Sequence, residues 1–154
     1  GNVLAGNSPG CKDGAVVIRI GRGAAVKKYG FNPMARIVFM AVAGVDPSGM
    51  GVGPVPATKK ALERGNLTVG DLDLIELNEA FASQSLQVVR HLGLDMDKVN
   101  VNGGAIALGH PLGATGTILT IRMMSELKRQ QKQFGVVTMC IGGGMGAAGV
   151  FEML

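Results

Sequence analysis

The sequence predicts an α/β fold with a mixed, mostly parallel sheet covered by helices. Short apolar runs rich in β-branched residues alternate with segments that repeat apolar residues at helical spacing, as is typical of layered α/β domains. The last two apolar runs are joined only by the glycines 142–144, which are too few for a crossover helix, so these strands should be antiparallel neighbours. The chain has 154 residues, of which 47% are hydrophobic and 17% are charged, so it can bury a real core.

The elements follow from apolar runs and the residues that bound them. The first predicted strand is residues 14–20, a short β-branched run between glycines. Further strands are predicted at five places, which gives a five-stranded sheet: residues 36–45, 74–77, 99–101, 135–141 and 147–153. Helices are predicted at four places, three of them followed by a glycine: residues 24–29, 57–64, 78–92 and 114–129. Thr68 and Asp71 resemble a capping box for one helical turn.

The domain organisation is predicted from an internal similarity. Residues 13–20 resemble residues 146–153, since in both segments small residues open an apolar strand. We therefore expect residues 1–32 to be the closing strand and helix of an N-terminal half. Residues 33–154 would then be a complete C-terminal domain of a duplicated architecture.

Composition argues against several classes of function. The net charge of +4 lies within residues 1–32, so the chain has a short basic segment rather than a basic nucleic-acid-binding domain. Cys11 and Cys140 are not part of a C-x-x-C pair, which gives no support for a zinc site. The uncharged run at residues 135–151 is too short and too rich in glycine for a membrane span. A G-x-G-x-x-G match at residues 144–149 has no room for the helix that dinucleotide binding needs.

Three strand-to-loop junctions carry candidate chemistry, at Asn78, His110 and Cys140. Ligands of α/β sheets bind beyond the carboxyl ends of the strands, so we expect these residues to converge there. A thiol whose pKa is lowered by a nearby histidine is a base or nucleophile, and an asparagine amide can hold a water or an oxyanion. Two simpler readings stay open: Asn78 as a helix N-cap, and Cys140 as a small buried apolar residue.

Three sequence blocks resemble the signature blocks of the thiolase family. They are Asn-Glu-Ala-Phe-Ala at residues 78–82, the glycine-rich block that contains Gly-His-Pro at residues 100–114, and Cys-Ile-Gly-Gly-Gly-Met-Gly at residues 140–146. The resemblance covers essentially the whole chain. It implies a thiolase-like layered fold, of which this chain is the C-terminal portion. It also implies an acyltransferase that cleaves 3-ketoacyl-CoA or condenses two acyl-CoA molecules through an acylated cysteine.

The resemblance also implies roles for particular residues. Asn78 would hold a water in one oxyanion hole, and His110 would activate the nucleophile and line that hole. Cys140 would be the acid and base, and the Gly142 N–H would belong to the other oxyanion hole. We expect Met50, Ala80 and Phe81 to line an apolar acyl pocket beside them. Coenzyme A thioesters are substrates of the family, so no cofactor and no metal is expected.

One family feature has no counterpart in this sequence. The acylated cysteine of thiolases lies in their N-terminal half, and Cys11 does not match its motif. This chain alone is therefore expected to be inactive and to need the N-terminal thiolase half as a partner. The intact enzyme would be a homodimer or homotetramer in the cytoplasm, or in an organellar matrix. The alternatives are a non-catalytic assembly fragment, or a half-enzyme subunit completed by a separate N-terminal chain.

Overall fold

A four-stranded mixed sheet forms the centre of the molecule. The computed structural model describes residues 2–154. The strands are β1 (Ala35–Gly44), β2 (Leu74–Leu77), β3 (Phe134–Ile141) and β4 (Met145–Met153), in the order β1-β4-β3-β2. β2 runs parallel to β3, whereas β4 is antiparallel to both β3 and β1. The predicted α/β class and the antiparallel final strand pair are confirmed. The prediction of a mostly parallel sheet is wrong, because only the β2–β3 pair of the described strands is parallel and the predicted strands at residues 14–20 and 99–101 do not join the sheet.

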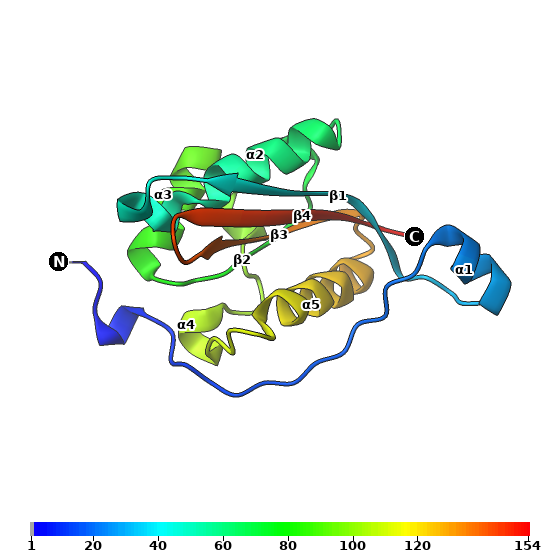
Figure 1. Ribbon diagram of the computed structural model, residues 1–154, viewed down its shortest axis with the longest axis horizontal. Helices are drawn as coiled ribbons and strands as arrows, with labels where there is room; N and C mark the ends of the chain where they lie inside the picture. Colours follow the sequence, from blue (N-terminus) through cyan, green and yellow to red (C-terminus); the bar gives the residue numbers. More distant parts are fainter. Residues whose placement is uncertain (1) are drawn as a thin grey trace.

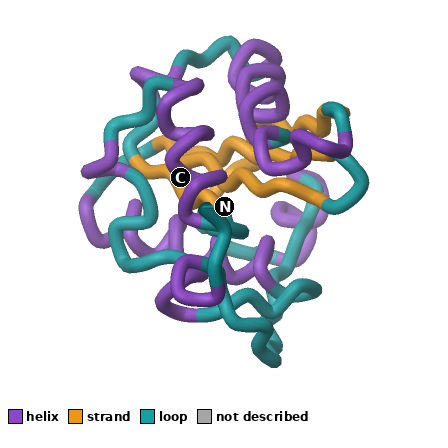
Figure 2. The backbone as a smooth tube through the Cα atoms, turned by 90° about the vertical axis from the view of Figure 1, so that its left-hand side faces the viewer, coloured by secondary structure: helices purple, strands orange, loops and turns teal. Residues whose placement is uncertain are grey.

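The helices lie on the two faces of this sheet (Figure 1). α2 (Pro54–Arg64) and α3 (Ala82–Leu92) cover one face, and α5 (Thr115–Gln130) covers part of the other. Figure 2 shows the strands between helical segments on either side. The remaining helices are α1 (Gly23–Tyr29) and the short α4 (Ala105–Leu108). Four 3-10 turns complete the chain: η1 (Ala5–Asn7), η2 (Pro47–Val52), η3 (Val69–Asp71) and η4 (Met96–Lys98).

The predicted fifth strand at residues 99–101 is wrong. Val99 makes a single parallel bridge to Ile75, and no ladder follows it. The reason lies at Asn100, whose φ of +47° is in the left-handed region and turns the chain away from the sheet. The segment still touches β2, since the Asn100 N–H donates to the Ile75 carbonyl at 2.8 Å.

The predicted strand at residues 14–20 is also wrong. This segment is extended without a strand partner and runs past α4 and α5 to reach α1 (Figure 1). Val17 is 89% exposed and Ile20 is 74% exposed. A β-branched run forms a strand only where a neighbour accepts its backbone hydrogen bonds, and no described residue does so here.

One predicted helix boundary is wrong, and one short helix was not predicted. The helix predicted from residue 78 begins at Ala82, because Phe81 is extended (φ −154°, ψ 146°) and residues 78–81 form a loop. α4 lies within the glycine-rich block at residues 100–114, where no helix is predicted. The capping box is confirmed: the Thr68 N–H and hydroxyl both donate to Asp71 Oδ2 at 2.7 Å.

Core side chains pack on both faces of the sheet. One cluster joins α2 and α3 to the sheet around Ile75 and Leu77, and a second joins α5 around Met123 and Leu127. No described helix is long and apolar enough to cross a bilayer.

Candidate functional site

The carboxyl ends of β2 and β3 meet at one edge of the sheet. The two strands are parallel, with Leu77 opposite Thr138. Asn78 directly follows β2, and its backbone N–H donates to the Thr138 carbonyl at 3.0 Å. Cys140 lies two residues further along β3, just before the turn at residues 142–144. The structure therefore places Asn78 and Cys140 on adjacent strands at the same end.

Asn78 is buried in a way that an N-cap residue is not. Its side chain is 2% exposed, and its Oδ1 has no hydrogen-bond partner among the described residues. The N-cap of α3 is Phe81, so the N-cap reading of Asn78 is wrong. A buried amide oxygen without a partner is costly, and it is an acceptor ready for a water or ligand donor.

His110 lies in the loop between α4 and α5, where contacts from two other segments hold it. The loop follows α4 and Gly109, and the His110 N–H donates to the Gly10 carbonyl at 2.9 Å. His110 Nδ1 lies 2.7 Å from Thr115 Oγ1, which donates its own proton to the Pro111 carbonyl at 2.9 Å. A hydroxyl has one proton, so we assign the proton of the neutral imidazole to Nδ1. His110 Nε2 is then free to act as a base.

The first turn of α5 connects His110 to β3. Thr115 is the first residue of this helix. The next residue, Gly116, faces Met139, so that a Cβ at Gly116 would lie 3.3 Å from the Met139 methyl group. Cys140 follows Met139, so the helix start that holds the His110 ring lies against the end of β3. Sequence reasoning missed Thr115; the signal for it is its position directly after the glycine-rich block.

The thiol of Cys140 differs electrostatically from the sequence-based expectation. Cys140 is half-buried, and burial raises the pKa of its thiol. Burial also lowers the pKa of His110, so its imidazole is neutral at pH 7 and supplies no positive charge to stabilise a thiolate. The expectation that a nearby histidine lowers the thiol pKa is therefore wrong for the resting state. Both groups rest uncharged.

The other predicted residues lie on segments around the same edge. Gly142 is in the β3–β4 turn, and Met50 is in η2, which contacts β3, β4 and α3. Ala80 and Phe81 are half-buried in the loop between β2 and α3. Residues 2–154 contain no group of three or more His, Cys, Asp or Glu side chains that could hold a metal ion.

Comparison with known proteins identifies the family. The family described as "Thiolase, C-terminal domain" matches residues 31–153. The chain is 56% identical over 153 residues to a 3-ketoacyl-CoA thiolase of Bacillus subtilis, covering 99% of this chain and 39% of the relative. It is 53% identical over 154 residues to the beta-ketothiolase BktB of Cupriavidus necator, again covering 39% of that relative. The chain belongs to the thiolase family, as its sequence blocks predict, and it spans about two fifths of the length of these relatives.

Solved structures agree with this assignment. The acetyl-CoA acetyltransferase of Bacillus anthracis superposes with a TM-score of 0.96 at 47% identity, covering 99% of this chain and 39% of that one. Human mitochondrial 3-ketoacyl-CoA thiolase in complex with CoA superposes with a TM-score of 0.90 at 45% identity, with the same coverage. The thiolase-like fold class is confirmed.

Proposed function

We propose that this chain supplies the proton-transfer part of a thiolase active site. The complete enzyme cleaves 3-ketoacyl-CoA or condenses two acyl-CoA molecules through an acylated cysteine that lies outside this sequence. The observation that carries the proposal is the buried Asn78 amide, whose Oδ1 has no partner among the described residues. Asn78 follows β2, and Cys140 lies at the same end of the adjacent strand β3. A water that donates to this oxygen would be oriented to hydrogen-bond a substrate oxygen.

Acyl transfer uses His110 in this proposal. Its free Nε2 takes the proton of the nucleophilic thiol, and the resulting sulfur attacks the thioester carbonyl of an acyl-CoA. The bond between that carbonyl carbon and the coenzyme A sulfur then breaks. The departing coenzyme A thiolate takes the proton from the imidazolium, so His110 returns to its neutral state.

Carbon–carbon bond formation uses Cys140. Its thiolate removes the α-proton of a second acyl-CoA, and the enolate carbon attacks the acyl carbonyl of the enzyme. The bond between the acyl carbon and the nucleophilic sulfur then breaks, and the departing thiolate takes the proton that Cys140 removed, so both groups return to their starting states. Because burial raises the pKa of Cys140, its thiolate is scarce at neutral pH but a stronger base for a carbon acid. Donors from the Asn78 water and the Gly142 N–H would stabilise the negative oxygens.

Beside these residues, we place the acyl chain of the substrate against Met50, Ala80 and Phe81. We assign no cofactor, because the acyl-CoA substrates carry the reacting groups. We assign residues 1–32 to the closing part of an N-terminal half and residues 33–154 to the C-terminal domain. The intact enzyme would be a homodimer or homotetramer of the cytoplasm or of an organellar matrix.

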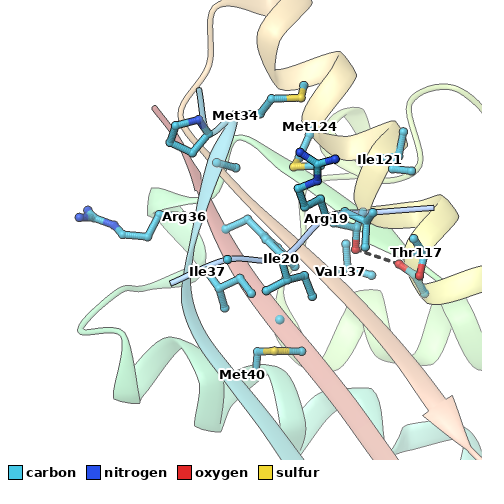
Figure 3. Close-up of a pocket in the computed structure, with 18 of the residues that line it drawn as sticks. Arg19, Ile20, Met34, Arg36, Ile37, Met40, Thr117, Ile121, Met124 and Val137 are labelled. Carbon is cyan, nitrogen blue, oxygen red and sulfur yellow. Dashed lines mark hydrogen bonds between the residues drawn. The ribbon is translucent and has the colours of Figure 1, made fainter. Parts of the chain in front are cut away.

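An apolar groove on this chain supports the proposal that further parts of a thiolase pack against it. The groove has a volume of about 1770 Å³ and lies between residues 17–21, α1, β1, β4 and α5. Figure 3 shows Ile20, Ile37, Met40, Ile121 and Met124 around it. Apolar surface of this extent is normally covered by a partner or another domain. We propose that the remaining part of the thiolase covers it.

A hybrid enzyme tests the proposal. The aligned segment of the Bacillus subtilis relative is replaced by this chain, and acetoacetyl-CoA thiolysis is measured for the hybrid, for the hybrid with His110→Ala, and for this chain alone. We expect turnover only in the unsubstituted hybrid. A hybrid that folds and assembles without turnover would favour the non-catalytic alternative, and turnover by this chain alone would overturn the assignment of the nucleophile.

A further inference from the structure

We propose that Glu79 and Asn100 are positioning residues that fix Asn78 and His110 relative to each other. The inference rests on the proposed function, because it concerns the geometry of that site. Neither side chain takes part in the proposed acyl transfer or in carbon–carbon bond formation. Together they connect the end of β2, which carries Asn78, to the short helix that precedes His110.

Asn100 holds the end of β2 as a neighbouring strand would. Its Oδ1 accepts the Leu77 N–H at 2.9 Å, and its Nδ2 donates to the Leu77 carbonyl at 2.8 Å. The same Nδ2 donates to Glu79 Oε1 at 3.3 Å. The residues on either side of Asn78 are therefore both bound to one side chain. Asn100 adopts a φ of +47° in doing so, and backbone in this region is held only where its surroundings fix it.

Glu79 extends this connection to α4. Its Oε2 accepts the Ile106 N–H at 2.9 Å, and Ile106 is the second residue of that helix. First-turn N–H groups have no partner within a helix, so a carboxylate there satisfies a donor that would otherwise be unpaired. Gly104 makes the approach possible, because a Cβ at this position would overlap the Glu79 carboxylate.

His110 is sensitive to the position of α4. The helix ends at Leu108 and is followed by Gly109, whose φ is +100°, and then by His110. The Gly10 carbonyl of the N-terminal segment accepts the His110 N–H, and Thr115 of α5 contacts the His110 ring. Glu79, the residue after Asn78, holds α4 through the Ile106 N–H and so acts on His110 indirectly. A catalytic histidine displaced by about 1 Å can lose on the order of 100-fold in rate, so this link has a measurable consequence.

The substitution Glu79→Gln tests the link with almost no change in size. Both partners of Glu79 are N–H donors, and a carboxylate accepts from both. Glutamine has one acceptor oxygen and turns its NH₂ group toward the other donor. Gly104→Ala disturbs the same contact from the opposite side. The control is Glu63→Gln, the same chemical change at an exposed position of α2.

Two readouts are made on these variants. In the 154-residue chain, we expect amide exchange at Ile106 to accelerate at least 10-fold and the His110 ring resonances to shift in both test variants, with neither change in the control. In the hybrid thiolase, we expect kcat to fall roughly 10- to 100-fold with KM within about twofold. Thermal unfolding of each variant separates these effects from loss of folded protein.

The outcomes distinguish this inference from the proposed function. Unchanged Ile106 exchange and unchanged kcat in Glu79→Gln would overturn the positioning role. A loss of stability with unchanged kcat per folded molecule would also overturn it, because Glu79 would then only support the fold. If Glu79→Gln does not fold, Gly104→Ala decides by the same measurements. An inactive unsubstituted hybrid would count against the proposed function, while the exchange and ring resonances of the chain would still decide the link.

Discussion

At the scale of single residues, the site rests with an uncharged acid and an uncharged base. Burial raises the pKa of the Cys140 thiol and lowers the pKa of the His110 imidazole. Thr115 assigns the ring proton to Nδ1 and leaves Nε2 free. In the proposed reaction the two groups have separate tasks, because His110 serves the nucleophile and Cys140 serves the α-carbon.

This division predicts how Cys140→Ala changes the hybrid enzyme. Condensation should fall by about 10²- to 10⁴-fold, because removing a general acid and base typically costs this much. Formation of the acyl-enzyme from acyl-CoA should persist, because it uses His110. His110→Ala should impair both steps. Mass spectrometry of the acylated protein and a separate condensation assay measure them. Condensation of acetyl-CoA at the unsubstituted rate in Cys140→Ala would mean that Cys140 only fills space.

Glu76 predicts a pH dependence of stability. It is buried, its Oε2 has no hydrogen-bond partner among the described residues, and Arg122 lies 3.9 Å away. Burial raises the pKa of Glu76 from 4.5 to about 7. Between these values the folded chain binds more protons than the unfolded chain, so the contribution of Glu76 to stability is present below pH 4.5 and is lost as the pH rises through 7.

The substitution Glu76→Gln isolates this contribution, since glutamine resembles the protonated acid. We compare the unfolding free energy of the variant with that of the unsubstituted chain. The difference, variant minus unsubstituted, should be smallest near pH 4.5 and should be larger at pH 8 by on the order of 2–3 kcal/mol. Denaturant unfolding at several pH values measures the difference. A difference that does not change with pH would show that Glu76 is ionised in the folded chain throughout.

The candidate residues could be predicted from the sequence, but their states could not. Asn78, His110 and Cys140 stand in long sequence blocks that indicate their chemistry. Element order also predicts the common end of Asn78 and Cys140, but it fails for His110, which follows α4 and not a strand. The buried environment of Cys140 and the partner of the His110 ring depend on how α5 packs on β3. Packing of this kind is a tertiary property that has no local sequence signal.

At the scale of elements, predictions held where a local signal sets the boundary. α3 ends where Gly93 takes a φ of +64°, and α1 ends where Gly30 takes a φ of +63°, as their glycines predict. The same approach fails for residues 14–20 and 99–101, because a strand also needs a partner. Residues 14–20 find none within the described chain, and residues 99–101 turn away after one bridge.

The unpaired segment predicts a contrast in hydrogen exchange. Residues 14–20 are almost all exposed and form no strand, whereas residues 135–141 belong to β3 and pair with strands on both sides. Amides of the first segment should exchange at nearly the rate of an unfolded peptide. Those at the centre of β3 should exchange only through large-scale opening. Exchange measured residue by residue tests this, and equal protection of the two segments would contradict it.

At the scale of the whole molecule, the two faces of the sheet are covered unequally. α2 and α3 pack on one face, whereas α5 leaves β1 and β4 open on the other. Met40 and Val42 of the edge strand β1 are 59% and 65% exposed. A long edge strand with exposed apolar side chains is a template for association. This distribution fits a domain whose second face is completed by other parts of a thiolase.

The open face predicts that the isolated chain self-associates. Burial of apolar surface should drive the association, so sulfate should strengthen it. The double substitution Ile37→Glu and Met40→Glu places charges on β1 within the groove and should shift the chain toward monomer, as measured by sedimentation velocity. Leu86→Glu is the matched control, because Leu86 is an exposed apolar residue of α3 that does not line the groove. A concentration-independent monomer for the unsubstituted chain would show that this face is stable in water, and equal dissociation by the control would place the contact elsewhere.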